Sequence, residues 1–118
     1  KVGRLFREFS NFYKDAPPFR FTLPSYARRE ELPALAMCEF SEKAIMLTKA
    51  ALMGDGEMFE EIVRADNPLS CRSLGRRVRG FDQELWDRHL HETAFEVVRQ
   101  KFEASGALRE VLLSTADA

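Results

Sequence analysis

Cysteine, histidine and clustered glycine are scarce in this chain of 118 residues, and each shortage excludes a class of site. The two cysteines, Cys38 and Cys71, make no disulfide framework and lack the spacing of a zinc site. The two histidines, His89 and His91, also lack metal-ligand spacing. The six glycines are scattered, so they form no Gly-rich phosphate loop. We therefore expect neither a metal nor another cofactor.

Long apolar runs and an excess of one charge are absent as well. No apolar run reaches the roughly 18 residues of a membrane helix and no signal peptide is visible, so we expect no membrane partner. The net charge of −1 creates no field that favours nucleic acid. The low cysteine usage is typical of a reducing compartment, so we expect a cytoplasmic protein, and nothing indicates an obligate protein partner. The length corresponds to one domain.

The most informative stretch is the segment 42–53, EKAIMLTKAALM. Good helix formers dominate it, and apolar residues cover nearly every direction of the helical wheel. This pattern predicts a helix in the middle of the core. Glu42 and Lys49 are about two turns apart, so both side chains point to the same side. Two charges on one side of a buried helix are costly unless they line a polar cavity or are otherwise satisfied.

Structural roles also account for these charged residues, and the sequence leaves both interpretations open. Ser41 is predicted as the N-cap of this helix, and a carboxylate in the first turn, such as Glu42, suits the helix dipole. Lys49 can lay its stem along apolar surface and reach water with its amine.

The remaining periodicity predicts a mainly α-helical domain with a small β element near the N-terminus. Strands are predicted near 3–7 and at 19–23. Residues 26–32 are predicted as an exposed, charged loop or insertion, with or without one helical turn. Further helices are predicted from residue 55 or 56 to about 65, at 68–74 with Pro68 first and an end at Gly75, at 82–104 and at 107–113. The predicted buried stripe of the long helix is Trp86, Leu90, Ala94, Val97, Val98 and Phe102.

Three features fit either a structural or a functional role. The Ser-Asn pair within the FSNF segment at 9–12 forms a turn or cap, or it faces a stacked ligand. The arginine cluster at 72–79 forms a solvated edge, or Arg76 binds phosphate while Gly75 allows close backbone approach. Trp86 packs in the core, or it forms the wall of a base-binding pocket.

Five segments, taken in chain order, resemble the NADAR family, also called YbiA-like N-glycosidases. Their order and spacing over almost the whole chain make the resemblance specific, although no single segment does. A departure is the connection 24–38, which is longer and more charged than expected. The matching residues are Phe9-Ser10-Asn11-Phe12, Ser41-Glu42 with Lys49, Pro68 with Leu74-Gly75-Arg76, Trp86 with Lys101-Phe102, and Leu108 with Leu112-Leu113-Ser114-Thr115.

The resemblance implies a single multihelical NADAR-like domain over residues 1–118 that hydrolyses the N-glycosidic bond between a ribosyl group and a base-like nitrogen. Family substrates include ADP-ribosylated guanine and ribosylaminopyrimidine phosphates of riboflavin synthesis. The implied partner is thus a small nucleotide-like molecule or an ADP-ribosylated nucleic-acid base. No metal or redox cofactor is implied.

On the matching residues, the resemblance implies a catalytic set and a substrate-binding set. Glu42 would stabilise positive charge on the ribosyl ring and activate water as a general base. Lys49 would hold Glu42 ionised or bind a ribose or phosphate oxygen, and Trp86 would stack on the base or exclude water. The substrate-binding set is Phe9, Ser10, Asn11, Phe12, Gly75 and Arg76.

Two other functions stay open. Family members continue with a strand and an Asp/Trp-Gly segment that supplies an acidic residue, whereas this chain stops at Ala118, so we expect this segment to be missing. The first alternative is therefore a non-catalytic module that binds ADP-ribose or a nucleotide. The second is a structural helical domain in which Glu42 is a cap and Lys49 is exposed.

Overall fold

Helices dominate the structure of this chain. The computed structural model describes residues 18–104. Its elements are β1 (Phe19–Thr22), the short 3-10 helix η1 (Ser25–Ala27), β2 (Leu35–Cys38), α2 (Ser41–Leu52), α3 (Gly56–Arg64), α4 (Pro68–Arg76) and α5 (Gln83–Ala104). The predicted mainly α-helical domain with a small β element near the N-terminus is confirmed. The predicted strand near 3–7, the FSNF segment and the helix at 107–113 lie outside the described residues.

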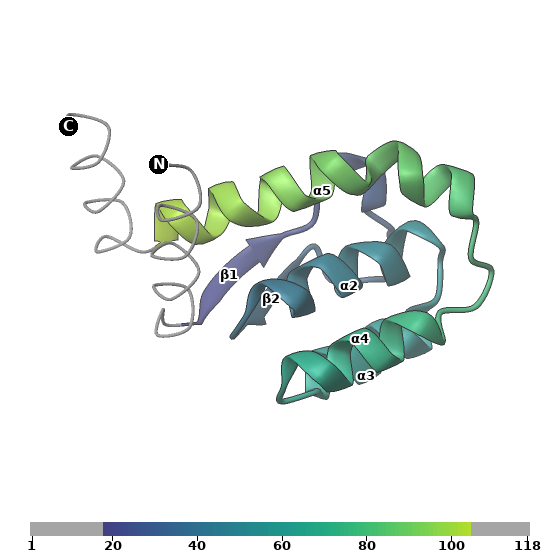
Figure 1. Cartoon of the computed structure of the whole chain (residues 1–118), viewed down its shortest axis with the longest axis horizontal. Coiled ribbons are helices and arrows are strands. Elements are labelled where there is room, and N and C mark those ends of the chain that lie inside the picture. The colour runs from purple at the N-terminus through teal and green to yellow at the C-terminus, as the bar shows by residue number, and fades with distance from the viewer. Residues whose placement is uncertain (1–17, 105–118) are drawn as a thin grey trace, which may run out of the picture.

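The helix α2 is central, as its sequence predicts. Figure 1 shows α2 between α5 on one side and the pair α3 and α4 on the other. The side chains of Ala44, Leu47, Ala50 and Ala51 are fully buried at 0% exposure. Apolar residues surround this helix because it meets packing partners in several directions, and a surface helix would need only one apolar stripe.

The start of α2 corrects the prediction for Ser41. Ser41 is the first residue of the helix rather than its N-cap, and no side-chain hydrogen bond caps this end. Phe40 takes the N-cap position in an extended conformation (φ −153°, ψ 161°), and its side chain packs against the core. The helix therefore begins directly after Phe40, whose ring enters the core. Ser41 lies one residue beyond the N-cap position.

The strands β1 and β2 form an antiparallel pair in which Phe19 lies opposite Cys38. In β1, Phe19 and Phe21 are 2% and 0% exposed while Arg20 is exposed, so the predicted alternation is confirmed. The pair faces α5 through β1, as Figure 1 shows.

The sequence does not predict β2. Its apolar residues Leu35 and Met37 are 48% and 53% exposed, so no buried apolar alternation marks the strand. Pairing with β1 determines it, and the ladder continues to a hydrogen bond of 2.8 Å from Leu23 N to Ala34 O.

The segment 26–32 is not the wholly exposed loop that its charges predict. Ala27 is fully buried, and the half-buried Tyr26 ring stacks on His89 with a centroid separation of 4.2 Å. The Tyr26 hydroxyl also shares a hydrogen bond of 2.8 Å with Thr93 Oγ1. This segment is therefore bound to α5, because its few uncharged residues reach the core.

Arg29, in the same segment, completes the C-terminal end of α2. Its Nε donates to Ala51 O at 3.0 Å and its Nη2 to Leu52 O at 2.7 Å. A cation is favourable beside the last carbonyls of a helix, which lack intrahelical partners. The charge that makes this segment look like a loop thus stabilises the central helix.

Side-chain caps define the starts of α3 and α4. Asp55 caps α3 by accepting from Met58 N at 3.1 Å, and Asn67 caps α4 by accepting from Ser70 N at 2.8 Å. Pro68 is the first residue of α4, as predicted, because a first-turn position needs no N–H donor. The helix continues one residue beyond its predicted end at Gly75.

The buried stripe of α5 differs in part from its prediction. Trp86 and Val97 are buried at 7% and 1% exposure, but Val98 is 40% exposed. Adjacent helical residues point about 100° apart, so the side that buries Val97 turns Val98 outward. The polar residues Thr93 and Lys101 are buried on that side instead, at 0% and 2% exposure. Among the helices that the structure describes, none is long and apolar enough to span a membrane.

Candidate functional site

Lys49 is the point at which three segments of the chain meet. Its Nζ lies 4.6 Å from the centre of the Phe81 ring and 6.0 Å from that of the Trp86 ring. An ammonium at this distance from an aromatic face is attracted to it. The half-buried Lys49 therefore does not extend into open solvent. The structure brings it together with Trp86 of α5, which is also a predicted site residue.

Arg76 adds a second positive charge at this place. It is the last residue of α4 and is exposed. Burial, and then the charge of Arg76, lower the pKa of the Lys49 ammonium. Within residues 18–104, neither cation forms an ion pair with a carboxylate. Two neighbouring cations without an acidic partner favour an anionic ligand such as phosphate.

Glu42 stands on the same side of α2, but toward the other end of the helix. It is half-buried in the first turn, about 10 Å along the axis from Lys49 at 1.5 Å per residue. The charge of Glu42 acts on Lys101 of α5, because burial lowers the pKa of Lys101 while the charge of Glu42 raises it. The charge that lowers the pKa of Lys49, after burial, is that of Arg76. The role of Lys49 toward Glu42 stays a prediction.

Lys101 is a candidate residue that the sequence reasoning missed. It is 2% exposed, and its Nζ lies 5.9 Å from the centre of the Phe19 ring. Two signals were present in the sequence, because Lys101 follows the apolar stripe of α5 and belongs to the Trp-to-Lys-Phe match of the NADAR resemblance. A lysine on the buried side of a helix requires a compensating charge or polar partner.

Gly75 has a structural reason to be glycine. It is buried, and a Cβ added there would overlap Sδ of Met46 on α2. The missing side chain thus lets α4 approach α2 closely. The next residue, Arg76, supplies the charge that acts on Lys49. The close approach that Gly75 allows is therefore an approach of α4 to α2. Binding of substrate by Gly75 stays a prediction.

The remaining predicted substrate-binding residues belong to the FSNF segment. Phe9, Ser10, Asn11 and Phe12 all lie outside the described residues. Their role as binding residues for the base or the ribose stays a prediction.

Comparison with known proteins assigns the family. The chain matches the NADAR domain over residues 4–118. It belongs to the NADAR domain family. This NADAR domain is 36% identical over 75 residues to a protein of Acanthamoeba polyphaga mimivirus named an N-glycosidase, an alignment that covers 64% of this chain and 44% of the viral protein.

A second relative is the protein irg-1 of Caenorhabditis elegans, which is 30% identical over 124 aligned residues. That alignment covers 98% of this chain and 57% of the nematode protein. The chain thus spans about half the length of the curated relatives that it matches. No solved structure matches it.

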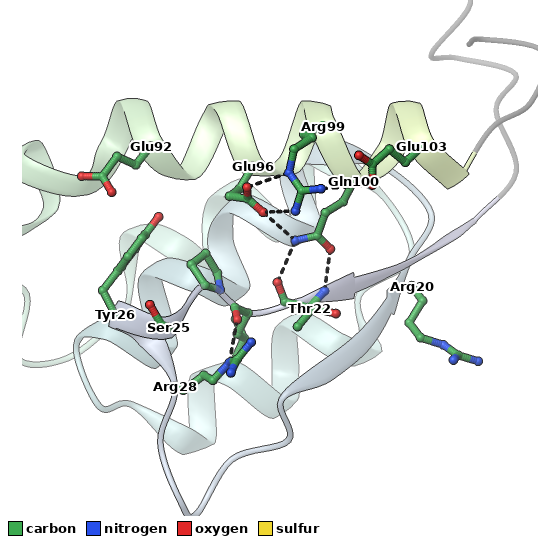
Figure 2. Close-up of a pocket in the computed structure, with 12 residues that line it drawn as sticks. Arg20, Thr22, Ser25, Tyr26, Arg28, Glu92, Glu96, Arg99, Gln100 and Glu103 are labelled. Carbon is green, nitrogen blue, oxygen red and sulfur yellow. Dashed lines mark hydrogen bonds and ion pairs between the residues drawn. The ribbon is translucent and has the colours of Figure 1, made fainter. Parts of the chain in front are cut away.

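A separate cavity of about 680 Å³ lies between β1, η1 and α5 of the NADAR domain and is shown in Figure 2. No predicted site residue lines it. It is bordered by three arginines and three glutamates, so its charges balance; these are Arg20, Arg28, Arg99, Glu92, Glu96 and Glu103. Gln100 holds the β1 edge there by accepting from Thr22 N at 2.7 Å and donating to Thr22 O at 2.9 Å. An anionic substrate therefore suits the Lys49 and Arg76 cluster better than this cavity.

The two cysteines of the NADAR domain are buried thiols. Burial raises the pKa of Cys38 to about 12 and that of Cys71 to about 11. At neutral pH both are therefore protonated and poor nucleophiles. Residues 18–104 contain no group of three or more histidine, cysteine or acidic side chains arranged to hold a metal ion.

Proposed function

We propose that this NADAR domain carries the active site of an N-glycosidase that cleaves the bond between a ribosyl carbon and the nitrogen of a base. The observation that supports it most directly is the arrangement along α2, with Glu42 at one end and Lys49, beside Trp86 and under the influence of the Arg76 charge, at the other. Membership of the family and the name of the viral relative support the same class of reaction.

In this hydrolysis the electron pair of the carbon–nitrogen bond leaves with the base nitrogen, and positive charge develops on the ribosyl ring. The Glu42 carboxylate stabilises that charge and accepts a proton from the water that attacks the anomeric carbon. The departing base takes up a proton from solvent. Lys101 of α5 supplies a positive charge that interacts with the charge of Glu42.

The substrate we propose is a phosphorylated ribosyl compound, of the ADP-ribosyl-guanine or ribosylaminopyrimidine phosphate type. Lys49 and Arg76 supply positive charge for a phosphate, because neither is neutralised by a carboxylate among the described residues. Trp86 is only 7% exposed, so it would support Lys49 and exclude water rather than offer an open stacking face.

The alternative is a module that binds ADP-ribose or a nucleotide without turnover. The cationic end of α2 would be sufficient for this function, because Lys49 and Arg76 lie apart from Glu42. Binding without hydrolysis would depend on Lys49 and Arg76 and would be indifferent to the Glu42 charge.

Release of free base distinguishes the two functions. The protein is incubated with ADP-ribosylated guanosine or a ribosylaminopyrimidine phosphate, and the base is followed by chromatography. Glu42→Gln is nearly isosteric, and it should lower the rate by about two to four powers of ten. The matched control is Glu84→Gln, which removes an exposed carboxylate from the first turn of α5. Equal rates in Glu42→Gln and wild type would reject the catalytic role, and binding of ADP-ribose without any base release would establish the alternative.

A further inference from the structure

The connection between α4 and α5, residues 77–82, is fastened to the turn that follows α2. Asp55 in that turn is buried, with only 1% of its side chain exposed, and it accepts from Arg79 N at 2.8 Å and from Arg79 Nη2 at 3.0 Å. The same carboxylate caps α3 through Met58 N. One buried acid thus ties the connection to two helices.

A second set of contacts turns the connection back toward α2. Gly80 has a φ of +69°, a left-handed conformation that favours glycine. Asp82 N then donates to Met53 Sδ at 3.3 Å. Phe81 lies between Arg79 and Asp82, so the contacts of these two residues determine its place on the surface.

Phe81 is held in an unusual place for an apolar side chain. Its ring covers the Lys49 ammonium at 4.6 Å, yet 39% of the residue remains exposed. Single exposed apolar residues are common and need no explanation by themselves. Here, however, the exposed ring lies against Lys49, on which the charge of Arg76 also acts, and neither cation has a carboxylate partner among residues 18–104.

We propose that Phe81 is a substrate-contacting residue that stacks on the flat ring of a nucleotide base while Lys49 and Arg76 hold its phosphate, and that Asp55 is a positioning residue that places Phe81 through Arg79. A partly exposed aromatic ring beside an anion site provides both elements that nucleotides require, a stacking surface and positive charge. This inference rests on the site of the proposed function, but it concerns recognition of the base and not cleavage.

Binding measured without turnover tests it. Calorimetric titration compares GMP and AMP, which carry a base, with ribose phosphate, which does not. Phe81→Leu should raise the Kd for the two nucleotides by about 5- to 150-fold, the usual effect of removing one aromatic stack, and should leave ribose phosphate unchanged. Phe81→Tyr keeps the ring and should retain wild-type affinity.

The positioning role is tested at Arg79, whose side chain is 65% exposed. Arg79→Ala leaves Asp55 free to cap α3 but releases the side-chain contacts that hold the connection. It should weaken nucleotide binding several-fold while ribose phosphate binding stays the same, and Arg79→Lys should restore part of the loss. Arg64→Ala is the matched control, because Arg64 also forms an exposed ion pair, with Glu60, on another helix.

Each result decides between stacking and a merely structural ring. Equal loss of nucleotide and ribose phosphate affinity in Phe81→Leu would show that Phe81 only organises Lys49, and unchanged nucleotide affinity would also overturn the proposal. Failure of wild-type protein to bind GMP or AMP would overturn it as well. Selective loss of nucleotide binding in a protein that releases no base would uphold the stacking role while rejecting the N-glycosidase.

Discussion

The Lys49 ammonium lies 6.0 Å from the centre of the Trp86 ring, a contact that joins the end of α2 to the start of α5. Both residues are members of one set in the resemblance to NADAR proteins, and the fold places them side by side. Lys43, the other lysine of α2, is buried and has different contacts from Lys49. Its Nζ donates to both carboxylate oxygens of Glu39 at 3.0 Å and to Val63 O at 2.8 Å. Lys43 is thus satisfied by the protein, whereas Lys49 forms no ion pair with a carboxylate within residues 18–104.

This contrast predicts opposite effects of the same substitution. Lys49→Met should leave the melting temperature unchanged or raise it, because it replaces a partly desolvated ammonium that Arg76 repels. Lys43→Met should cost about 1.5–3 kcal/mol of unfolding free energy through its lost charged hydrogen bonds. Thermal melting measures both. Phosphate binding should fall about tenfold or more in Lys49→Met alone. A large loss of stability in Lys49→Met would show that this lysine is structural.

Trp86 should contribute strongly to stability because it is only 7% exposed. Trp86→Ala should lower the free energy of unfolding by about 3–5 kcal/mol, and Trp86→Phe by less, because a smaller cavity remains. Denaturant unfolding measures the difference. Phe95, which is 68% exposed on the same helix, provides the control, and Phe95→Ala should change stability little. Equal stability of Trp86→Ala and wild type would contradict the buried position.

Asp55 predicts an acid-dependent loss of stability. The hydrogen bonds from Arg79 lower the pKa of the Asp55 carboxyl from 3.8 to about 2. A lowered folded pKa stabilises the protein above the unfolded value of 3.8, and this contribution disappears as the pH falls through about 2. It amounts to about 1–2 kcal/mol, since solvent around Arg79 weakens the interaction. Asp55→Asn should therefore flatten the stability curve between about pH 4 and pH 2, as measured by denaturant unfolding at each pH. An unchanged slope would show that Asp55 titrates normally.

The buried thiols predict a second loss of stability at alkaline pH. Burial raises the pKa of Cys38 from 9.0 to about 12 and that of Cys71 from 9.0 to about 11. Raised folded values stabilise the protein below the unfolded value of 9.0 and lose this effect as the pH rises through about 11 to 12. Cys38→Ala and Cys71→Ala should each reduce the alkaline loss. A thiol reagent should react with wild type only at the rate of unfolding, and rapid reaction of the folded protein would contradict the burial.

Most helices could be predicted from local sequence. The cap at Asn67 with Pro68 marks the start of α4, and the apolar residues all around 42–53 indicate a core helix. The predictions were wrong, or a strand was missed, where contacts between distant residues override the local pattern. Phe40 enters the core and displaces Ser41 from the cap, and β2 exists through its pairing with β1 although Leu35 and Met37 face solvent.

By itself, the sequence determined which segments are helical and which residues match the NADAR family, since helix periodicity, capping and motif order are properties of neighbouring residues. Only the tertiary structure decided which charges meet. The spacing of Glu42 and Lys49 along one helix suggested a pair, and the packing adds charges from other helices, because the charge of Glu42 acts on Lys101 of α5 and that of Arg76 of α4 acts on Lys49. Electrostatic interactions depend on distance through space, and residues far apart along the chain become neighbours only when the helices pack.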